Sequence, residues 1–487
     1  MAVNNGTTKM SSYRWTIVAM LFMATTVNYL DRQVLSLTWN DFIAPEFHWT
    51  NNDYGTITAL FSMFYAISLL FAGRFVDWMG TKKGFHWAIG IWSVGAVLHA
   101  FCGIATSGVV SGNWFVGFHG ASESIQNFIA TTGDVSKVIN VSVTMFIFAR
   151  LVLAIGEAGN FPAAIKTTAE YFPKKDRAYA TSIFNAGATV GALAAPIVIP
   201  WLAATWGWEA SFIVIGGLGF IWMGWWQFGY AKPSKHARVN AAELEYIQQD
   251  GDDKYESCEN AGSSISMLKC LSYKQTWAFA FGKFMTDGVW WFFLFWTPAY
   301  LSSVYGLKSS DPQAQVALFV LYAITLLSIL GGYLPTILVE KKGMDPYSGR
   351  MRSMLIFAFF PLLALFAQPL GSISYWFPVI IIGIAGAAHQ AWSANIFSTV
   401  GDMFPKAAIA TITGIGGLAG GLGSTLINKG SGKLFDYAEK SGLNFMGYSG
   451  LEAGYFIIFC VCAVAYLIGW IVMKALVPKY SPITDLS

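Results

Sequence analysis

Hydrophobic and polar positions alternate along this chain in long blocks, in which extended apolar runs are separated by short polar segments. A helix needs about 20 apolar residues to cross the hydrocarbon core of a bilayer. In lipid the backbone must satisfy its own hydrogen bonds, so helices are the expected spanning form for runs of this length. The pattern predicts twelve transmembrane helices, at about 13–37, 52–75, 84–105, 143–166, 179–203, 208–230, 276–304, 313–338, 352–370, 374–400, 407–431 and 450–476.

The composition agrees with an all-α polytopic membrane protein. Of the 487 residues, 55% are hydrophobic and 12% are charged, whereas soluble domains carry about 25% charged residues. A net charge of +3 is too small for an electrostatic nucleic-acid binder. The five cysteines form no CxxC pair and no disulfide framework. These features exclude a secreted miniprotein, a disordered chain and an ordinary cytosolic enzyme, and we expect no metal and no cofactor.

The distribution of lysine and arginine predicts the topology. If the amino terminus lies inside, the inside segments carry most of the basic residues, as in the pairs Lys82-Lys83 and Lys341-Lys342. The first apolar run continues past Asp31 and Arg32 without a cleavage site, so it is a retained helix and not a signal peptide. The positive-inside rule then places both termini in the cytoplasm of a bacterial inner-membrane protein.

The chain divides into two halves around its longest polar stretch. We expect an N-terminal six-helix bundle at 1–230 with the coupling charges, a cytoplasmic linker at 231–275, and a C-terminal six-helix bundle at 276–487 for substrate recognition. Within the linker, Asn240 followed by Glu243 predicts a capping box that opens a short surface helix.

Short sequence motifs recur in the two halves in the same order. The segment Phe172-Pro173-Lys174 recurs as Phe404-Pro405-Lys406, and each copy follows an acid, Glu170 or Asp402. Farther along each copy comes a pair of glycines, Gly187 and Gly191 in the first half and Gly417 and Gly421 in the second. Internal repeats of this kind are typical of transporters. The glycine pairs predict close helix packing rather than a site.

Four charged residues lie within the predicted spans of the first half and away from the span ends. Asp31 and Arg32 belong to the first span, and Arg150 and Glu157 to the fourth. Tyr29 and Arg32 lie on one helix face. Charge in a bilayer is costly and indicates function by default, although buried ion pairs that hold two helices together are the structural alternative. Fixed cations beside titratable acids suit proton-coupled capture of an organic anion, since protonation of the acids frees the arginines.

The second half carries one charged pair and a set of neutral polar groups. Lys283 and Asp287 are four residues apart, as in a local ion pair or a gate contact. The tenth span carries several groups that suit sugar hydroxyls, although bonding between helices is an equal alternative for them. They are His389, Gln390, Trp392, Ser393 and Asn395. Gln390 and Asn395 project to different sides of the helix, so we expect one to serve the substrate and the other packing.

These motifs resemble a known family. The spacing Gly73-x3-Asp77-x2-Gly80-x-Lys82-Lys83 is similar to the loop motif of the major facilitator superfamily, with Trp78 where a basic residue is usual. The segment Asn28-Tyr29-Leu30-Asp31-Arg32 and the spacing Arg150-x6-Glu157 resemble the anion:cation symporters. The segments from Trp290 to Trp296 and from Ala388 to Lys406 resemble the bacterial hexuronate transporters.

The resemblance implies roles for individual residues. Asp31 and Glu157 match the proton-coupling acids. Tyr29, Arg32 and Tyr65 match residues that hold the sugar-acid carboxylate, and Arg150 matches the arginine that interacts with the coupling acids. The chain lacks a polar residue that galactonate relatives carry in the fifth span, near Gly187, which argues against galactonate.

The sequence thus predicts a symporter that imports a hexuronate, such as glucuronate or galacturonate, with protons. Its partners are the sugar acid, protons and the lipid bilayer, with no nucleic acid, and we expect a monomer. The alternative within transport is a carrier for an aldonate or another organic anion, with sodium coupling as an option. A membrane enzyme or receptor is the alternative from another class, but no HExxH, GxSxG or P-loop pattern occurs at a span end.

Overall fold

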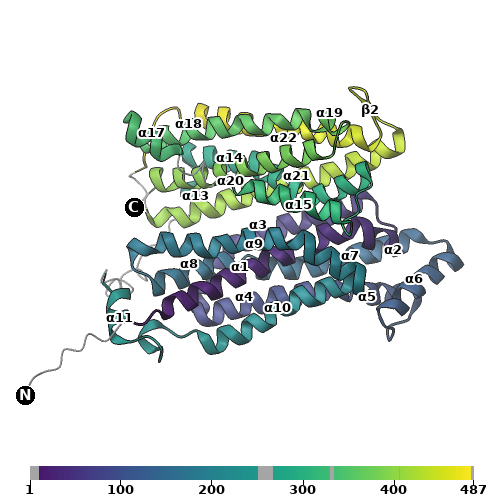
Figure 1. Cartoon of the computed structure of the whole chain (residues 1–487), viewed down its shortest axis with the longest axis horizontal. Helices are drawn as coiled ribbons and strands as arrows, with labels where there is room; N and C mark the ends of the chain where they lie inside the picture. Colours follow the sequence, from purple (N-terminus) through teal and green to yellow (C-terminus); the bar gives the residue numbers. More distant parts are fainter. Residues whose placement is uncertain (1–9, 250–266, 329–333, 405, 484–487) are drawn as a thin grey trace, which may run out of the picture.

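A computed structural model describes residues 10–249, 267–328, 334–404 and 406–483, and its helices form two bundles that lie side by side (Figure 1). The first bundle holds α1 (Tyr13–Thr38), η1 (Trp39–Ile43), α2 (Ala44–Phe47), α3 (Asn51–Met79), α4 (Thr81–Ala100), α5 (Cys102–Ser111), α6 (Phe118–Thr132), α7 (Val135–Glu157), α8 (Asn160–Tyr171), α9 (Lys174–Trp206) and α10 (Trp208–Gly229). The linker contributes η2 (Pro233–Lys235), α11 (Ala241–Ile247) and α13 (Met267–Cys270). The second bundle holds α14 (Lys274–Tyr305), α15 (Pro312–Thr325), α17 (Leu334–Lys342), α18 (Pro346–Phe359), η4 (Phe360–Phe366), α19 (Ala367–Gly371), α20 (Trp376–Met403), α21 (Lys406–Ser441), the hairpin β1 (Asn444–Phe445) and β2 (Tyr448–Ser449), and α22 (Leu451–Leu476).

Over the described residues, each of the twelve predicted spans overlaps one helix or consecutive helices. By length and composition, seven helical segments of that part could cross a membrane, and the bent pair α4 and α5 makes an eighth if it counts as one span. The remaining long helices are less apolar. In α1 the residues Asp31 and Arg32 lower the hydropathy, and in α14 the residues Lys283 and Asp287 do so. Hydropathy alone therefore misses α1 and α14, although it detects α7, which carries Arg150 and Glu157.

The long segment that precedes the fourth predicted span folds as helices at the end away from the chain termini (Figure 1). The axis bends by 51° between α4 and α5. Then α6 returns toward α7 with Ala121 and Ile125 buried, while Phe115 in the connecting turn is fully exposed. Gln126 donates to the backbone oxygen of Glu46 at 3.0 Å, which ties α6 to the start of the bundle.

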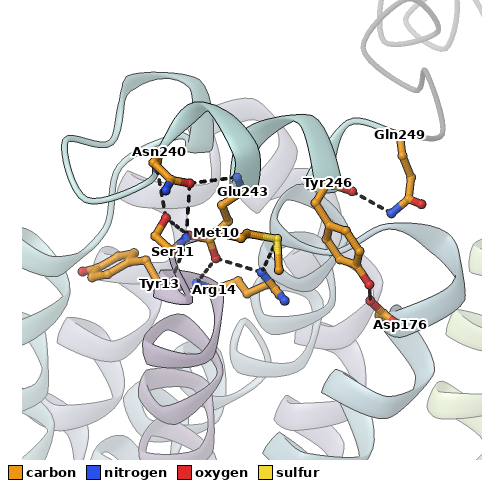
Figure 2. Close-up of polar contacts among 9 residues, drawn as sticks. All are labelled: Met10, Ser11, Tyr13, Arg14, Asp176, Asn240, Glu243, Tyr246 and Gln249. Carbon is orange, nitrogen blue, oxygen red and sulfur yellow. Dashed lines mark hydrogen bonds and ion pairs between the residues drawn. The ribbon is translucent and has the colours of Figure 1, made fainter. Parts of the chain in front are cut away.

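The short linker helix α11 docks onto the beginning of α1 (Figure 2). As predicted, the Asn240 side chain caps this helix by accepting from the backbone N–H of Glu243 at 2.9 Å. The Glu243 carboxylate, which is fully buried, extends to α1 instead of completing a simple capping box. It accepts from the backbone N–H groups of Tyr13 and Arg14 at 3.1 Å each, and it pairs with the Arg14 guanidinium at 3.1 Å. The linker thus supplies the anion that the amino terminus of α1 favours.

The repeated sequence motifs lie at comparable positions in the two bundles. Glu170, at the end of α8, accepts a hydrogen bond from Thr81 at the start of α4, at 2.5 Å. Its repeat partner Asp402, at the end of α20, accepts from the Arg350 Nε near the start of α18, at 2.6 Å. In each half, the acid therefore ties the helix that it ends to the start of an earlier helix.

The repeated glycines are packing positions, as predicted. A Cβ atom on Gly191 would lie 2.6 Å from the carbonyl oxygen of Thr26, so α9 packs closely on α1 only because this position has no side chain. A Cβ atom on Gly421 would collide with Ala66 of α3. The second glycine pair therefore packs α21 against the other bundle.

Hydrogen bonds join the two bundles toward the end that lies away from the chain termini. The carboxylate of Asp436 on α21 accepts from the backbone N–H groups of Asn51 and Asn52 at 2.9 and 3.0 Å, at the amino terminus of α3. The Asp41 carboxylate accepts from the backbone N–H of Ser309 at 2.7 Å. Tyr54 donates to the carbonyl oxygen of Phe295 at 2.8 Å. The two bundles are thus connected at this end by reversible hydrogen bonds, most of which involve a carboxylate.

Candidate functional site

Four buried charges meet where α1 and α7 face each other. Asp31, Arg32, Arg150 and Glu157 are each at most 6% exposed. Arg32 donates from Nε and Nη2 to the same Glu157 oxygen, at 3.2 and 3.0 Å. The sequence brings Arg150 and Glu157 onto one helix, but the structure pairs Glu157 with the arginine of the other helix. The ion pair therefore joins the two helices that carry the predicted coupling groups.

Several polar atoms of the charged groups in this cluster have no hydrogen-bond partner among the described residues. Both carboxylate oxygens of Asp31, Nε and Nη1 of Arg150, and the second oxygen of Glu157 are buried without one. The indole nitrogen of Trp92 is also unpartnered. An unpaired buried charge costs several kcal/mol (about 3–5 when a pair is broken). The arrangement therefore favours the uptake of a proton by an acid or of an anion by an arginine.

Three aromatic rings surround the Arg32 guanidinium. Its Cζ atom lies 5.2 Å from the ring centroid of Tyr29, 4.9 Å from that of Tyr65 and 5.0 Å from that of Trp291. Tyr29 and Tyr65 are the residues expected beside it, whereas Trp291 reaches it from α14 of the second bundle. Such rings stabilise a cation electrostatically. They leave the edge of the guanidinium, where Glu157 now binds, as the place for a carboxylate.

The local sequence explains how α7 presents Glu157. Asp134 caps the start of this helix by accepting from the backbone N–H of Lys137 at 3.0 Å. A Cβ atom on Gly156 would lie 2.7 Å from the carbonyl oxygen of Ala88. The end of α7 therefore packs directly on the backbone of α4. Glu157 is the last residue of the helix, and its carboxylate faces α1 at the break before α8.

Arg150 has a different environment from Arg32. Its Cζ atom lies 5.0 Å from the ring centroid of Phe61, and this ring lies 6.2 Å from Trp291. No ion pair joins Arg150 to Asp31 or Glu157 among the described residues. Sequence reasoning did not find Phe61 or Trp291 as neighbours of the arginines, although Trp291 belongs to the aromatic run that it singled out.

The polar residues of α20 divide between its faces. His389 Nδ1 lies 2.7 Å from the hydroxyl of Tyr466 on α22, and the imidazole stacks on Trp290 at 5.4 Å. Trp392 is fully buried and lies edge-on to the same tyrosine at 5.5 Å. These two residues thus face the interior of the second bundle.

The two amides of α20 have different surroundings. Asn395 is 2% exposed and donates to the carbonyl oxygen of Ala391 on its own helix, at 2.8 Å. Gln390 is half-buried and projects close to the direction of Phe397, which is 40% exposed. Ser393 is also half-buried. Asn395 therefore lies in the packed interior, whereas part of the Gln390 side chain remains accessible.

Lys283 and Asp287 form the local pair expected from their spacing. Their Nζ and Oδ2 atoms are 2.8 Å apart, and the ammonium group lies 4.3 Å from the ring centroid of Phe397. Across the described ranges, no group of three histidine, cysteine, aspartate or glutamate side chains is placed to hold a metal ion.

Comparisons with known proteins show which family the chain resembles. The model of the Major Facilitator Superfamily matches residues 21–427. The chain is 27% identical over 432 residues to the hexuronate transporter of Escherichia coli (strain K12), covering 88% of this chain and 89% of that protein. It is 25% identical over 327 residues to the galacturonate transporter of Dickeya chrysanthemi, covering 67% and 83%.

Solved structures share the architecture. A bacterial homolog of the human lysosomal transporter Spinster, in an inward-facing and occupied conformation, matches with a TM-score of 0.66 at 18% identity, covering 95% of this chain and 97% of that one. A D-xylose–proton symporter matches with a TM-score of 0.62 at 17% identity, covering 98% and 100%. These likenesses support the fold.

Proposed function

This chain belongs to the Major Facilitator Superfamily, and we propose that it imports hexuronates in symport with protons. The superfamily consists of transporters and not enzymes, and the chain is a multi-pass protein of the bacterial inner membrane. It has sugar-acid transporters among its relatives. The observation that carries the proposal is the buried ion pair of Arg32 and Glu157 beside the unpaired Asp31 and Arg150.

The ion pair supplies a mechanism for coupling. While Glu157 is ionised, its oxygen occupies the Nε and Nη2 edge of Arg32, where a sugar-acid carboxylate would bind. Protonation of Glu157 removes this competing charge and frees the guanidinium for the substrate. Proton and substrate then favour each other's binding by the same factor. Asp31 is a second proton acceptor, and Arg150 balances the charge of the two acids.

The second bundle recognises the ring and the hydroxyl groups of the substrate. A hexuronate differs from a simple organic anion by its ring and hydroxyl groups, and neutral polar groups recognise such features. We assign this role to Gln390 and Ser393, the half-buried polar residues of α20. His389, Trp392 and Asn395 support them by fixing the position of the helix.

Transport requires the two bundles to rock around this central site. We place both termini in the cytoplasm, on the basis of the lysine and arginine distribution. The contacts of Asp436 with α3 and of Asp41 with Ser309 then form an outer gate that is closed here. They must open when the site faces the outside, and the duplicated architecture lets each bundle move as a unit.

Uptake by the purified protein in proteoliposomes tests the proposal. Labelled glucuronate and galacturonate should accumulate when a proton gradient is directed inward, and accumulation should stop when a protonophore collapses the gradient. A sodium gradient of equal size should drive no accumulation. Accumulation driven by sodium alone, or a preference for an unrelated organic anion, would contradict the proposal.

A further inference from the structure

Trp291 is the point at which the second bundle touches the predicted carboxylate anchor. Its ring centroid lies 5.0 Å from the Arg32 Cζ atom, and its ring lies at 60° to that of Tyr65, 6.0 Å away. The side chain is half-buried and also packs on Phe295 at 5.1 Å. It therefore borders the anchor with part of its indole still accessible.

The neighbouring tryptophan of α14 faces another way. Trp290 stacks on His389 with an angle of 2° between the rings, at the interior face of α20. Consecutive helical residues project about 100° apart, so one indole contacts α20 and the next contacts α1 and α3. The two neighbouring tryptophans thus contact Arg32 on one side and His389 of α20 on the other.

We propose that Trp291 is a specificity residue that holds the ring of a cyclic hexuronate while Arg32 holds its carboxylate. This inference rests on the proposed function and goes further, because it selects ring-shaped sugar acids over open-chain ones. In a cyclic hexuronate the carboxylate carbon is bonded directly to a ring carbon. Once the carboxylate is on Arg32, the ring lies beside the anchor, and its C–H face can pack on the accessible indole face.

Open-chain sugar acids lack this rigid face. Galactarate and glucarate also offer a carboxylate and hydroxyl groups, but they carry them, with a second carboxylate, on a flexible chain that loses conformational entropy when it is ordered against a flat surface. They can use Arg32 and Gln390 as well as a hexuronate can, but they gain less from Trp291. A small apolar residue at this position should therefore weaken the binding of hexuronates selectively.

Trp291→Leu, compared with Trp291→Phe, tests the assignment in proteoliposome uptake and competition assays. An aromatic contact contributes about 0.5–1.5 kcal/mol beyond its buried area, so we expect Trp291→Leu to raise KM for glucuronate and galacturonate by about three- to tenfold. The concentration of galactarate or glucarate that halves uptake should change less than about twofold on the same scale. Trp291→Phe should retain most of the hexuronate affinity because it keeps a ring.

Trp277→Leu is the matched control, because Trp277 lies on the same helix and is 54% exposed. It should leave both constants unchanged. Stabilisation of the purified variants by each acid in thermal unfolding measures binding even if transport is lost. Equal losses for cyclic and open-chain acids, or unchanged constants for both, would overturn the assignment and leave the proposed function intact. If the wild-type protein did not transport hexuronates, both the assignment of Trp291 and the proposed function would be contradicted.

Discussion

Replacing Glu157 by glutamine should uncouple transport from the proton while preserving exchange. The substitution keeps the size of the side chain and mimics the protonated acid. In the wild type, the Glu157 carboxylate accepts two hydrogen bonds from Arg32, at 3.2 and 3.0 Å. An amide competes with the substrate carboxylate far less than a carboxylate does, so Arg32 becomes available at every pH.

The size of the effect follows from these contacts. Hydrogen bonds that involve a charged group contribute about 1.5–3 kcal/mol, and about 1.4 kcal/mol corresponds to a factor of ten. Ionised Glu157 should therefore weaken binding of the sugar acid at Arg32 by about ten- to a hundredfold. Because one proton is linked to binding, the wild-type KM should rise by up to about tenfold per pH unit above the titration of Glu157. Because ionised Glu157 competes with the substrate for Arg32, KM should fall under acid conditions and rise under alkaline conditions. The KM of Glu157→Gln should be nearly independent of pH.

Counterflow and gradient-driven uptake, measured on the same proteoliposomes, separate these effects. Counterflow exchange needs no net release of a proton, so it should persist in Glu157→Gln, whereas uphill accumulation should fail. Glu46→Gln is the matched control. Glu46 accepts from the indole N–H of Trp208 at 2.8 Å, and glutamine can still accept there. This variant should accumulate substrate like the wild type.

Three results would refute the reasoning. Uphill accumulation by Glu157→Gln would show that the proton is coupled elsewhere, and Asp31 would be the next residue to test. A KM of the variant that rises with pH as steeply as in the wild type would show that Glu157 does not compete for Arg32. Loss of counterflow together with a folded protein would mean that the carboxylate itself is needed to close the site.

Three further predictions follow from other contacts. Arg32→Lys should raise KM at least about tenfold in a protein that still unfolds cooperatively, because lysine lacks the planar fork; near-normal affinity in uptake assays would remove Arg32 from the carboxylate site. Gln390→Ala should raise KM for hexuronates by about five- to a hundredfold, whereas Asn395→Ala should lower the melting temperature and leave KM unchanged. The reverse pattern would show that the wrong face of α20 has been assigned to the substrate. Glu243→Ala should destabilise the protein by about 3–5 kcal/mol, since it leaves the buried Arg14 guanidinium without its partner, and an unchanged melting temperature in detergent would contradict this.

The helical architecture and the charged site follow from the sequence because they depend on local patterns. Apolar runs specify the spans, and the three-residue spacing predicts that Tyr29 lies beside Arg32, as the distance of 5.2 Å confirms. The spacing of four residues likewise predicts the pair of Lys283 and Asp287. In these cases the partners share one helix, so helix geometry alone determines the contact.

Contacts between helices could not be predicted in the same way. Whether Glu157 pairs with Arg32 or stays near Arg150 depends on how α1 is rotated against α7, which packing determines. The choice between Trp290 and Trp291 as the neighbour of Arg32 depends on the rotation of α14. Glu243 was found as a capping residue of its own helix, but its carboxylate binds α1 some 229 residues earlier in the chain.

The direct test of the central claim is to measure protons and sugar acid together. Proteoliposomes loaded with a pH-sensitive dye, without an imposed gradient, should acidify inside when glucuronate or galacturonate is added outside. Arg32→Lys and Glu157→Gln proteoliposomes should show no acidification, although the second variant still exchanges substrate. Uptake of labelled hexuronate by the wild type without any acidification would contradict proton symport through this site.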